Sequence, residues 1–236
     1  APLLFLLEVS LQPEGRGLGG SPADLLTAAH FENYAGALRR MGNFPRLLTN
    51  TALITVLSMA GQCFTCSLAG FAFARLRFRG RDALFLLVLA TMMLPDQMTT
   101  IPRFLLFRSL GLVDTYWPLV LPTVLGGAPF FIFLFRQYFL SLPSELDEAA
   151  RMDGCSPWAA YWRIYLPLAR PMLATVAIFT FLATWNDFWA PLIYVVSPEK
   201  RTLSTTACDC GPQSKWIAST PSGLPVALPP WRTLAA

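Results

Sequence analysis

The chain has 236 residues, of which 54% are hydrophobic and 14% are charged. Its mean hydropathy of +0.48 is too high for a typical soluble protein and indicates a membrane protein. The net charge of +4 comes from Lys and Arg beside apolar runs. These charges therefore indicate membrane topology, and we expect no nucleic-acid partner.

The first 46 residues combine one apolar segment with a polar stretch. Residues 1–11 lack an initial Met and a positively charged region, so we expect the end of a truncated first span rather than a signal peptide. Residues 11–46 are polar and punctuated by Gly and Pro, which predicts an external loop. Within it, FENYAGALRR at residues 31–40 predicts a short helix before the membrane.

The clearest membrane span covers residues 51–73, which carry no charge over 23 positions. About 20 helical residues are enough to cross the hydrocarbon core. An arginine cluster follows directly, which marks the cytoplasmic side and places the carboxyl end of this helix inside. The cluster consists of Arg75, Arg77, Arg79 and Arg81.

Three further spans are predicted along the chain. Residues 83–94 run outward and end or kink near Pro95. Residues 117–135 form the third span in spite of three prolines, because neighbouring helices can satisfy the carbonyl groups that prolines leave free. Residues 172–196 form the fourth span. Eight arginines lie near the predicted inner boundaries and six more fall outside; the inner charges are dense and the outer ones more diffuse, which favours this orientation.

Cysteine chemistry is not indicated by the pattern of the five cysteines. Cys63 and Cys66 form a C-x-x-C within an apolar run, and His30 is the only histidine in the sequence. Zinc or dithiol redox chemistry would need a polar surrounding and nearby His. We therefore expect packed thiols in a helix, with no metal site and no cofactor.

The loop between the third and fourth spans has an unusually specific composition. Ser144 predicts an N-cap, and acidic residues in the following turn favour a helix there. Leu146, Ala149 and Ala150 share one face, Asp147 can pair with Arg151, and Gly154 is a suitable residue after the helix end.

A second short helix is predicted after this glycine. Ser156 is its expected cap, Pro157 its first residue, and Pro167 its limit. The pattern alone fits two interpretations equally well: an amphipathic elbow at the membrane interface, or a docking site for a soluble partner.

A resemblance to a known family favours the second interpretation. Glu148, Ala149, Ala150, Gly154, Ile164, Leu166 and Pro167 reproduce the seven fixed positions of the pattern E-A-A-x3-G-x9-I-x-L-P. This pattern resembles that of inner-membrane permease subunits of ABC importers, in which the loop is a coupling helix held in a cleft of the ATPase subunit. The motifs FAFARLRFRGRDALF and FTFLATWNDFWAPLIYV are similar to those of carbohydrate-uptake permeases for maltose or glycerol 3-phosphate.

The resemblance implies an all-α, polytopic transmembrane helix bundle of the type I importer class. Residues 1–203 would form the permease domain, with the coupling loop at 141–171. The likeness stops at Leu203, where a last span is due. Residues 204–236 are rich in Pro and contain no apolar run long enough to cross a bilayer. We expect this segment to be a non-native tail, as a reading-frame change would produce.

The implied function is to form half of a pathway for sugar uptake across the bacterial or archaeal cytoplasmic membrane. The sequence contains no Gly-rich phosphate loop with its Lys, so ATP hydrolysis would belong to another subunit and the chain would not be an enzyme. The expected partners are an ABC ATPase, a second homologous permease, an extracytoplasmic solute-binding protein and membrane lipid. Two alternatives remain open: a permease for amino acids or ions, and a membrane anchor that docks an ATPase without transport.

Two groups of site residues follow. The resemblance assigns ATPase coupling to Glu148, Ala149, Ala150, Asp153, Gly154, Ile164 and Pro167. Polar and aromatic side chains within the spans give weaker candidates for the substrate pathway: Trp185, Asn186, Asp187 and Gln62. The tryptophan is suited to stack on a sugar ring, and equally to belong to an interfacial aromatic belt.

Overall fold

The structure, a computed structural model, describes residues 10–11 and 31–209, and within these ranges every regular element is helical. The described residues fall into two compact units, one of residues 47–205 and one that includes residues 31–46. In the smaller unit, helix α3 (Glu32–Arg40) confirms the short helix predicted before the membrane. The predicted first span at residues 1–11 lies largely outside the described residues.

The first long helix confirms the clearest predicted span. Helix α4 (Phe44–Arg75) has 32 residues, and at 1.5 Å per residue it is about 48 Å long, enough to cross the hydrocarbon core with turns to spare. The second predicted span is α5 (Arg81–Ala90), followed by a 3₁₀ turn (Thr91–Met93). The chain then bends by 103° at Pro95 into α6 (Asp96–Ser109), as the proline led us to expect.

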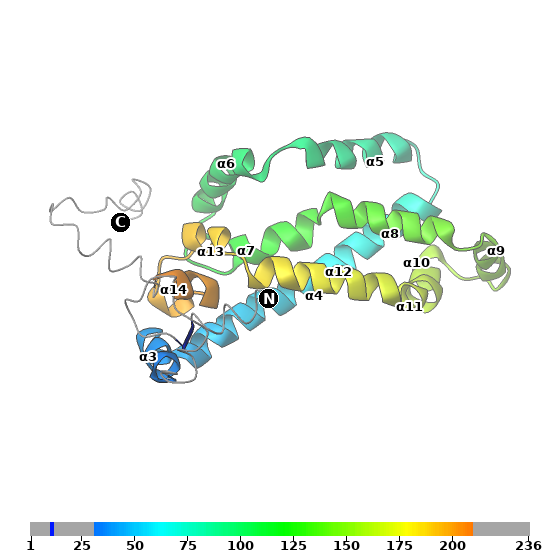
Figure 1. The fold of residues 1–236 in the computed structure, drawn as a ribbon. Helices are drawn as coiled ribbons and strands as arrows, with labels where there is room; N and C mark the ends of the chain where they lie inside the picture. Colours follow the sequence, from blue (N-terminus) through cyan, green and yellow to red (C-terminus); the bar gives the residue numbers. More distant parts are fainter. Residues whose placement is uncertain (1–9, 12–30, 210–236) are drawn as a thin grey trace, which may run out of the picture. The chain divides into compact units, whose positions relative to one another are not determined.

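The third span is irregular. It consists of α7 (Trp117–Leu121), a π-helical turn (Pro122–Gly126) and α8 (Pro129–Ser141). The stretch Trp117–Ser141 is long and apolar enough to cross a membrane. In Figure 1, α8 lies between α5 on one side and α4 and α12 on the other.

The fourth predicted span, residues 172–196, is not one helix. Helix α12 (Arg170–Trp185) ends where the chain breaks, and a short α13 (Trp189–Tyr194) follows. Asn186 Nδ2 donates to Leu182 O at 2.8 Å, and Asp187 Oδ1 accepts from Ala190 N–H at 3.3 Å. These side chains compete with the backbone for helical hydrogen bonds, and Pro191 has no N–H to donate to the carbonyl four positions earlier. The helix therefore ends before this segment.

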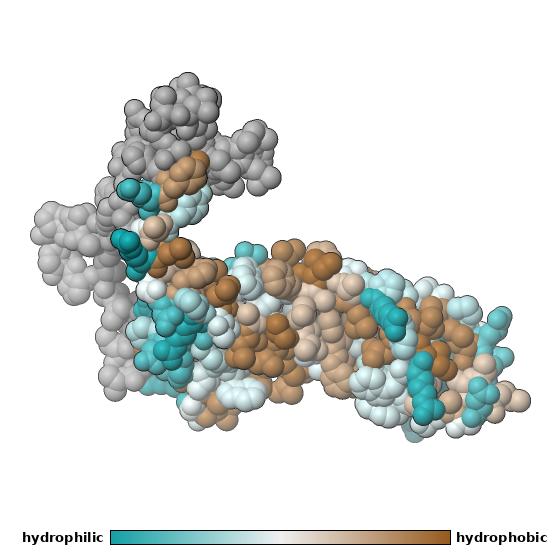
Figure 2. Space-filling model, turned by 90° about the horizontal axis from the view of Figure 1, so that it is seen from below, coloured by the Kyte–Doolittle hydropathy of each residue, from teal (hydrophilic) through white to brown (hydrophobic). Residues whose placement is uncertain are grey.

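Two described helices are long enough to span a membrane by themselves, and up to four are if each bent pair counts as one span. The bent pairs are 81–93 with 97–109, and 157–168 with 170–185. Many large apolar side chains are exposed, and Figure 2 shows them over much of the visible face. This is the surface expected for helices that meet lipid.

The core forms where α4 closely approaches the π turn and α8 of the third span. A Cβ at Gly61 would lie 2.2 Å from Val124 Cγ2, and one at Gly70 would lie 2.4 Å from Phe135 Cβ. Cys66, which is fully buried between these glycines, is a free thiol that packs in the helix contact. Small residues thus allow the first and third spans to pack together, as is common in membrane bundles.

The end of the described chain adds one helix. Helix α14 (Leu203–Asp209) begins at the position where we predicted the permease domain to end. The rest of the predicted tail, residues 210–236, lies outside the described residues. The assignment of residues 204–236 as a non-native tail stays a prediction.

Candidate functional site

The predicted coupling loop begins with an eight-residue helix, α9 (Glu145–Met152), at the end of the larger unit where α4 and α8 finish (Figure 1). Its first turn carries three acidic side chains, as predicted. Ser144 does not cap it through its side chain. With φ −69° and ψ −21° the serine is itself in the helical region, whereas an N-cap residue is normally extended. Leu146 N–H already donates to Pro143 O, and the Ser144 side chain accepts no hydrogen bond from the first turn.

Gly154 ends this helix in the way the sequence predicted. Its φ of +69° lies in the left-handed region, which side-chain-bearing residues rarely adopt. Gly154 N–H donates to Arg151 O at 3.0 Å, and Cys155 N–H donates to Ala150 O at 2.9 Å. These two bonds form a Schellman motif, which satisfies carbonyl groups at the helix end.

The second helix of the loop begins as predicted and ends later. Ala159 N–H donates to Ser156 Oγ at 3.2 Å, so the serine caps α10 (Pro157–Ala160). The helix then widens into a π turn (Tyr161–Tyr165) and continues through Pro167 in α11 (Leu166–Leu168). The prediction that the helix stops before the proline is wrong, because the wider π turn accommodates a residue that has no N–H to donate. A 75° bend leads into α12.

The coupling candidates divide between an exposed and a buried set. Glu148, Ala149, Asp153, Gly154 and Pro167 are exposed. Ala150, by contrast, is 5% exposed and belongs to the core, and the half-buried Ile164 packs against that core. The loop therefore presents one face outward and anchors itself with the other.

Met152 is a surface residue that no sequence motif indicated. It lies four positions after Glu148 on α9, and its side chain is 88% exposed. Met152 therefore belongs to the same exposed face of α9 as Glu148.

Asp147 has a different partner from the predicted one. We expected it to pair with Arg151 on the same helix. Instead, Arg75 at the end of α4 donates from Nη1 to Asp147 Oδ2 at 2.7 Å. The ion pair thus joins the loop to the first long span rather than stabilising α9 alone.

A cavity of about 980 Å³ lies within the larger unit, which is at the upper end of the usual size for small-molecule sites. Gln62 and Asp187, both predicted for the substrate pathway, line it together with Arg103. Trp185 stacks on Phe181 with ring centroids 5.2 Å apart, and neither it nor Asn186 is among the lining residues. Seven threonines supply most of the remaining polar lining: Thr51, Thr91, Thr99, Thr123, Thr180, Thr184 and Thr202.

Gln62 also has a structural part in this cavity. In the amide orientation that satisfies both of its groups, it donates to Thr123 O at 3.1 Å and accepts from Ala128 N–H at 2.8 Å. These backbone groups flank the break between the π turn and α8, where helical bonds are missing. The buried amide thus supports the irregular part of the third span while it borders the cavity.

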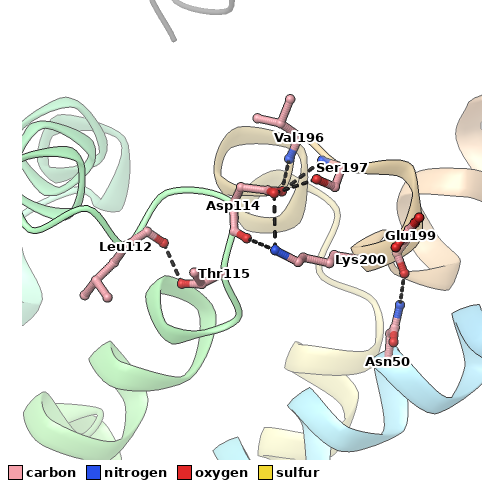
Figure 3. A network of polar contacts seen from close by, with 8 residues as sticks. All are labelled: Asn50, Leu112, Asp114, Thr115, Val196, Ser197, Glu199 and Lys200. Atoms are coloured by element: carbon pink, nitrogen blue, oxygen red, sulfur yellow. Dashed lines mark hydrogen bonds and ion pairs between the residues drawn. The ribbon is translucent and has the colours of Figure 1, made fainter. Parts of the chain in front are cut away.

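A polar network lies at the ends of the spans that are opposite to the coupling loop (Figure 3). Asp114, at φ +61°, accepts from Val196 N–H at 3.0 Å and from Ser197 N–H at 2.8 Å, and Lys200 Nζ donates to its carbonyl oxygen at 2.6 Å. Partial burial raises the pKa of Asp114, but the hydrogen bonds from Ser197, Val196 and Lys200 outweigh it and lower the pKa to about 2.

The same segment is held by the beginning of α4. Asn50 Nδ2 donates to Glu199 O and to Arg201 O, both at 3.0 Å, and Leu203 N–H donates to Thr51 Oγ1 at 2.9 Å. In the predicted orientation these contacts lie on the external side. The segment from 196 to 203 is therefore fixed to two other parts of the bundle.

The geometry agrees with a comparison of the chain with known protein families. Residues 67–206 match the family described as "Binding-protein-dependent transport system inner membrane component". The match covers the predicted coupling loop and most of the cavity walls. The chain belongs to this family. The resemblance found from the loop motif is confirmed, as are the all-α membrane bundle and the inner-membrane location.

Curated relatives of this permease component are similar over most of the chain. It is 35% identical over 174 residues to the probable ABC transporter permease protein YurM of Bacillus subtilis, covering 74% of the chain and 57% of YurM. It is 36% identical to the arabinooligosaccharides transport system permease protein AraQ of Halalkalibacterium halodurans, covering 86% of the chain and 72% of AraQ. The diacetylchitobiose uptake system permease protein NgcG of Streptomyces coelicolor is 32% identical over 86% of the chain and 67% of NgcG.

One solved structure has the same fold as this permease component. It is described as the crystal structure of a bacterial ABC transporter involved in the import of the acidic polysaccharide alginate. The TM-score is 0.73 at 26% identity, over 88% of this chain and 72% of the other. The chain thus spans between about half and three quarters of the length of these relatives.

Proposed function

We propose that this chain is one permease subunit of an ABC importer, that it forms half of a pathway for a sugar or oligosaccharide, and that a separate ATPase subunit drives it. The exposed coupling loop carries the proposal, because it places Glu148, Ala149 and Met152 on an outward face while Ala150 anchors the loop. Names of similar proteins mention arabinooligosaccharides, diacetylchitobiose and alginate, which supports a saccharide as the solute.

The cavity has the chemistry that a hydroxyl-rich solute needs. The hydroxyls of Thr123 and Thr180 donate to backbone carbonyl oxygens three or four positions earlier, so they offer acceptor lone pairs to the cavity. Arg103 adds donors and Asp187 adds acceptors. A sugar hydroxyl is both donor and acceptor, and can therefore bond with either kind of group.

The remaining subunits follow from the family. A second, homologous permease would complete the pathway, an extracytoplasmic solute-binding protein would deliver the solute, and the ATPase would hold α9. In this proposal Asp153, Gly154, Ile164 and Pro167 shape the loop, and Glu148 makes the contact that transmits the motion. Alternation between outward and inward openings then moves the solute.

A matched pair of variants tests the coupling part. Glu148 and Glu145 are both exposed acidic residues in the first turn of α9, so Glu148→Ala and Glu145→Ala remove the same charge from the same helix end. In complexes reconstituted into proteoliposomes, we expect only Glu148→Ala to uncouple ATP hydrolysis from solute uptake. Equal uptake per ATP in the two variants would contradict the assigned role.

Competition for uptake tests the solute class. Unlabelled oligosaccharides should reduce uptake of a labelled oligosaccharide by the reconstituted importer, whereas amino acids should not. Competition by amino acids alone would assign the chain to another solute class. Binding of the ATPase without any uptake would instead favour a membrane anchor.

A further inference from the structure

Arg75 is held in place by three separate hydrogen-bond acceptors. It is the last residue of α4, and its side chain is 9% exposed. Nη1 donates to Asp147 Oδ2 at 2.7 Å, and Nη2 donates to Phe139 O at 2.5 Å and Leu142 O at 2.7 Å. The two carbonyls belong to the end of α8, where helical partners are lacking and the helix dipole is negative.

Tyr165 completes this arrangement from the second helix of the loop. Its hydroxyl donates to Asp147 Oδ1, so both oxygens of the carboxylate are occupied. The Arg75 guanidinium lies over the Tyr165 ring, 5.2 Å from its centroid. The ring is fully buried and packs against Phe71 and Phe139, with centroids 5.0 and 5.9 Å away.

The contacts join four elements at one point: the end of α4, the end of α8, the helix α9 and the π turn 161–165. We call Arg75, Asp147 and Tyr165 the joint. All three members lie outside the seven positions of the family pattern in the loop. Breaking a largely buried ion pair leaves an uncompensated charge, so the joint resists opening.

The joint lies between the outward face of α9 and the cavity. Asp147 precedes Glu148, whose side chain is exposed. On the other side, α4 carries Thr51, Ile54 and Gln62 into the cavity wall. We propose that Arg75 is a positioning residue that makes α9, α8 and α4 move as one body, so that displacement of the coupling helix reaches the solute pathway. This inference rests on the proposed coupling of the chain to an ATPase.

The planar guanidinium is what allows one side chain to hold two helices. It presents donors in fixed directions to a carboxylate and to two carbonyls, whereas the Lys ammonium is a point charge on a flexible stem. Arg75→Lys should therefore keep the ion pair with Asp147 and lose part of the connection to α8. Arg75→Gln should lose the charge and most of the connection.

The test uses the full chain in proteoliposomes with its ATPase, its second permease and its binding protein. For each variant, solute imported per ATP hydrolysed and recovery of the ATPase with the complex are measured. We expect Arg75→Gln to retain the ATPase and to lower the transport ratio at least about fivefold, the lower end of typical coupling factors. Arg75→Lys should fall between this variant and wild type.

Arg79→Gln is the matched control, because Arg79 is an exposed arginine in the same inner loop and its loss should leave the ratio unchanged. A cross-link from Met152→Cys to the ATPase should form equally with and without the Arg75→Gln substitution, which shows that α9 is still docked. A purely structural role would lower the amount of assembled complex and leave the ratio of the assembled fraction intact.

Three results would overturn the inference in distinguishable ways. An Arg75→Gln complex that assembles with a wild-type ratio contradicts the joint. If that variant does not assemble, Tyr165→Phe, which removes only one hydroxyl, decides in its place, and an unchanged ratio contradicts the joint. A wild-type complex without ATP-driven uptake contradicts the proposed function, and the inference with it.

Discussion

Replacing Gly154 by Pro should uncouple transport while the protein still inserts into the membrane. The glycine has φ +69°, and a Cβ built on it meets nothing within 4 Å, so the effect is one of the backbone and not a clash. An alanine there would cost about 1–2 kcal/mol, because left-handed φ places Cβ near the following carbonyl oxygen. Proline is fixed near φ −65° and has no N–H, so the cost rises to about 3 kcal/mol or more.

This cost falls on the end of the coupling helix. The bonds from Gly154 N–H to Arg151 O and from Cys155 N–H to Ala150 O are lost, and the last turn of α9 must change direction. The loop lies outside the membrane spans, so insertion should not change. We expect Gly154→Ala to reduce solute uptake per ATP partly, and Gly154→Pro to reduce it more strongly.

Gly42 provides a close control for this experiment. It also has φ +69°, nothing within 4 Å of a built Cβ, and an N–H that donates to Arg39 O at 3.2 Å. It precedes α4 and lies far along the sequence from the loop. Gly42→Pro therefore imposes the same backbone conflict elsewhere, and we expect it to leave the ratio of uptake to ATP hydrolysis intact. Normal coupling in Gly154→Pro, or equal loss in both variants, would refute the reasoning.

Three further outcomes are expected. Gly70→Ala should destabilise the protein by about 1–3 kcal/mol, because its Cβ would lie 2.4 Å from Phe135 Cβ. Gly36→Ala, at an open helix position, should not destabilise it. The thermal midpoints of the two variants should therefore differ by about 2–4 °C per kcal/mol, and equal midpoints would contradict the close helix contact. The lowered pKa of Asp114, about 2 against an ordinary 3.8, means that the stabilisation by its carboxylate is present above about pH 4 and is lost as the pH falls toward 2. The thermal midpoint of the wild-type protein should therefore exceed that of Asp114→Asn at neutral pH and approach it in acid. A difference in midpoint that does not change with pH would exclude this role. Met152→Asp should weaken retention of the ATPase by the complex, because it replaces an exposed apolar side chain one turn after Glu148 by another negative charge. Unchanged retention would exclude Met152 from the docking face.

The periodic and compositional features of the chain could be predicted from its sequence. Uncharged runs and flanking arginines identified α4 and the third span. The thickness of the hydrocarbon core sets the length of an apolar run, and charged residues lie where the helix meets water. Gly154 and Ser156 could be predicted because their roles depend on the backbone of their immediate neighbours.

Features that depend on distant residues could not be predicted. Asp147 was expected to pair within its helix, but its carboxylate meets Arg75, which is 72 positions earlier. Arg75 was interpreted only as a topology signal. The passage of the helix through Pro167 depends on a π turn that no local pattern indicates. Asp114 bonds to residues more than 80 positions away, and nothing in its surrounding sequence points to them.

The most direct test of coupled transport by this chain is ATP-driven uptake of a labelled oligosaccharide by proteoliposomes that contain the chain, its partner permease, the ATPase and the binding protein. We expect uptake that requires hydrolysable ATP and all four components, and we expect Glu148→Ala to lower the amount of solute taken up per ATP consumed. Uptake without the ATPase, or ATP hydrolysis that never moves solute in the wild-type complex, would contradict the claim that the loop couples this permease to its motor.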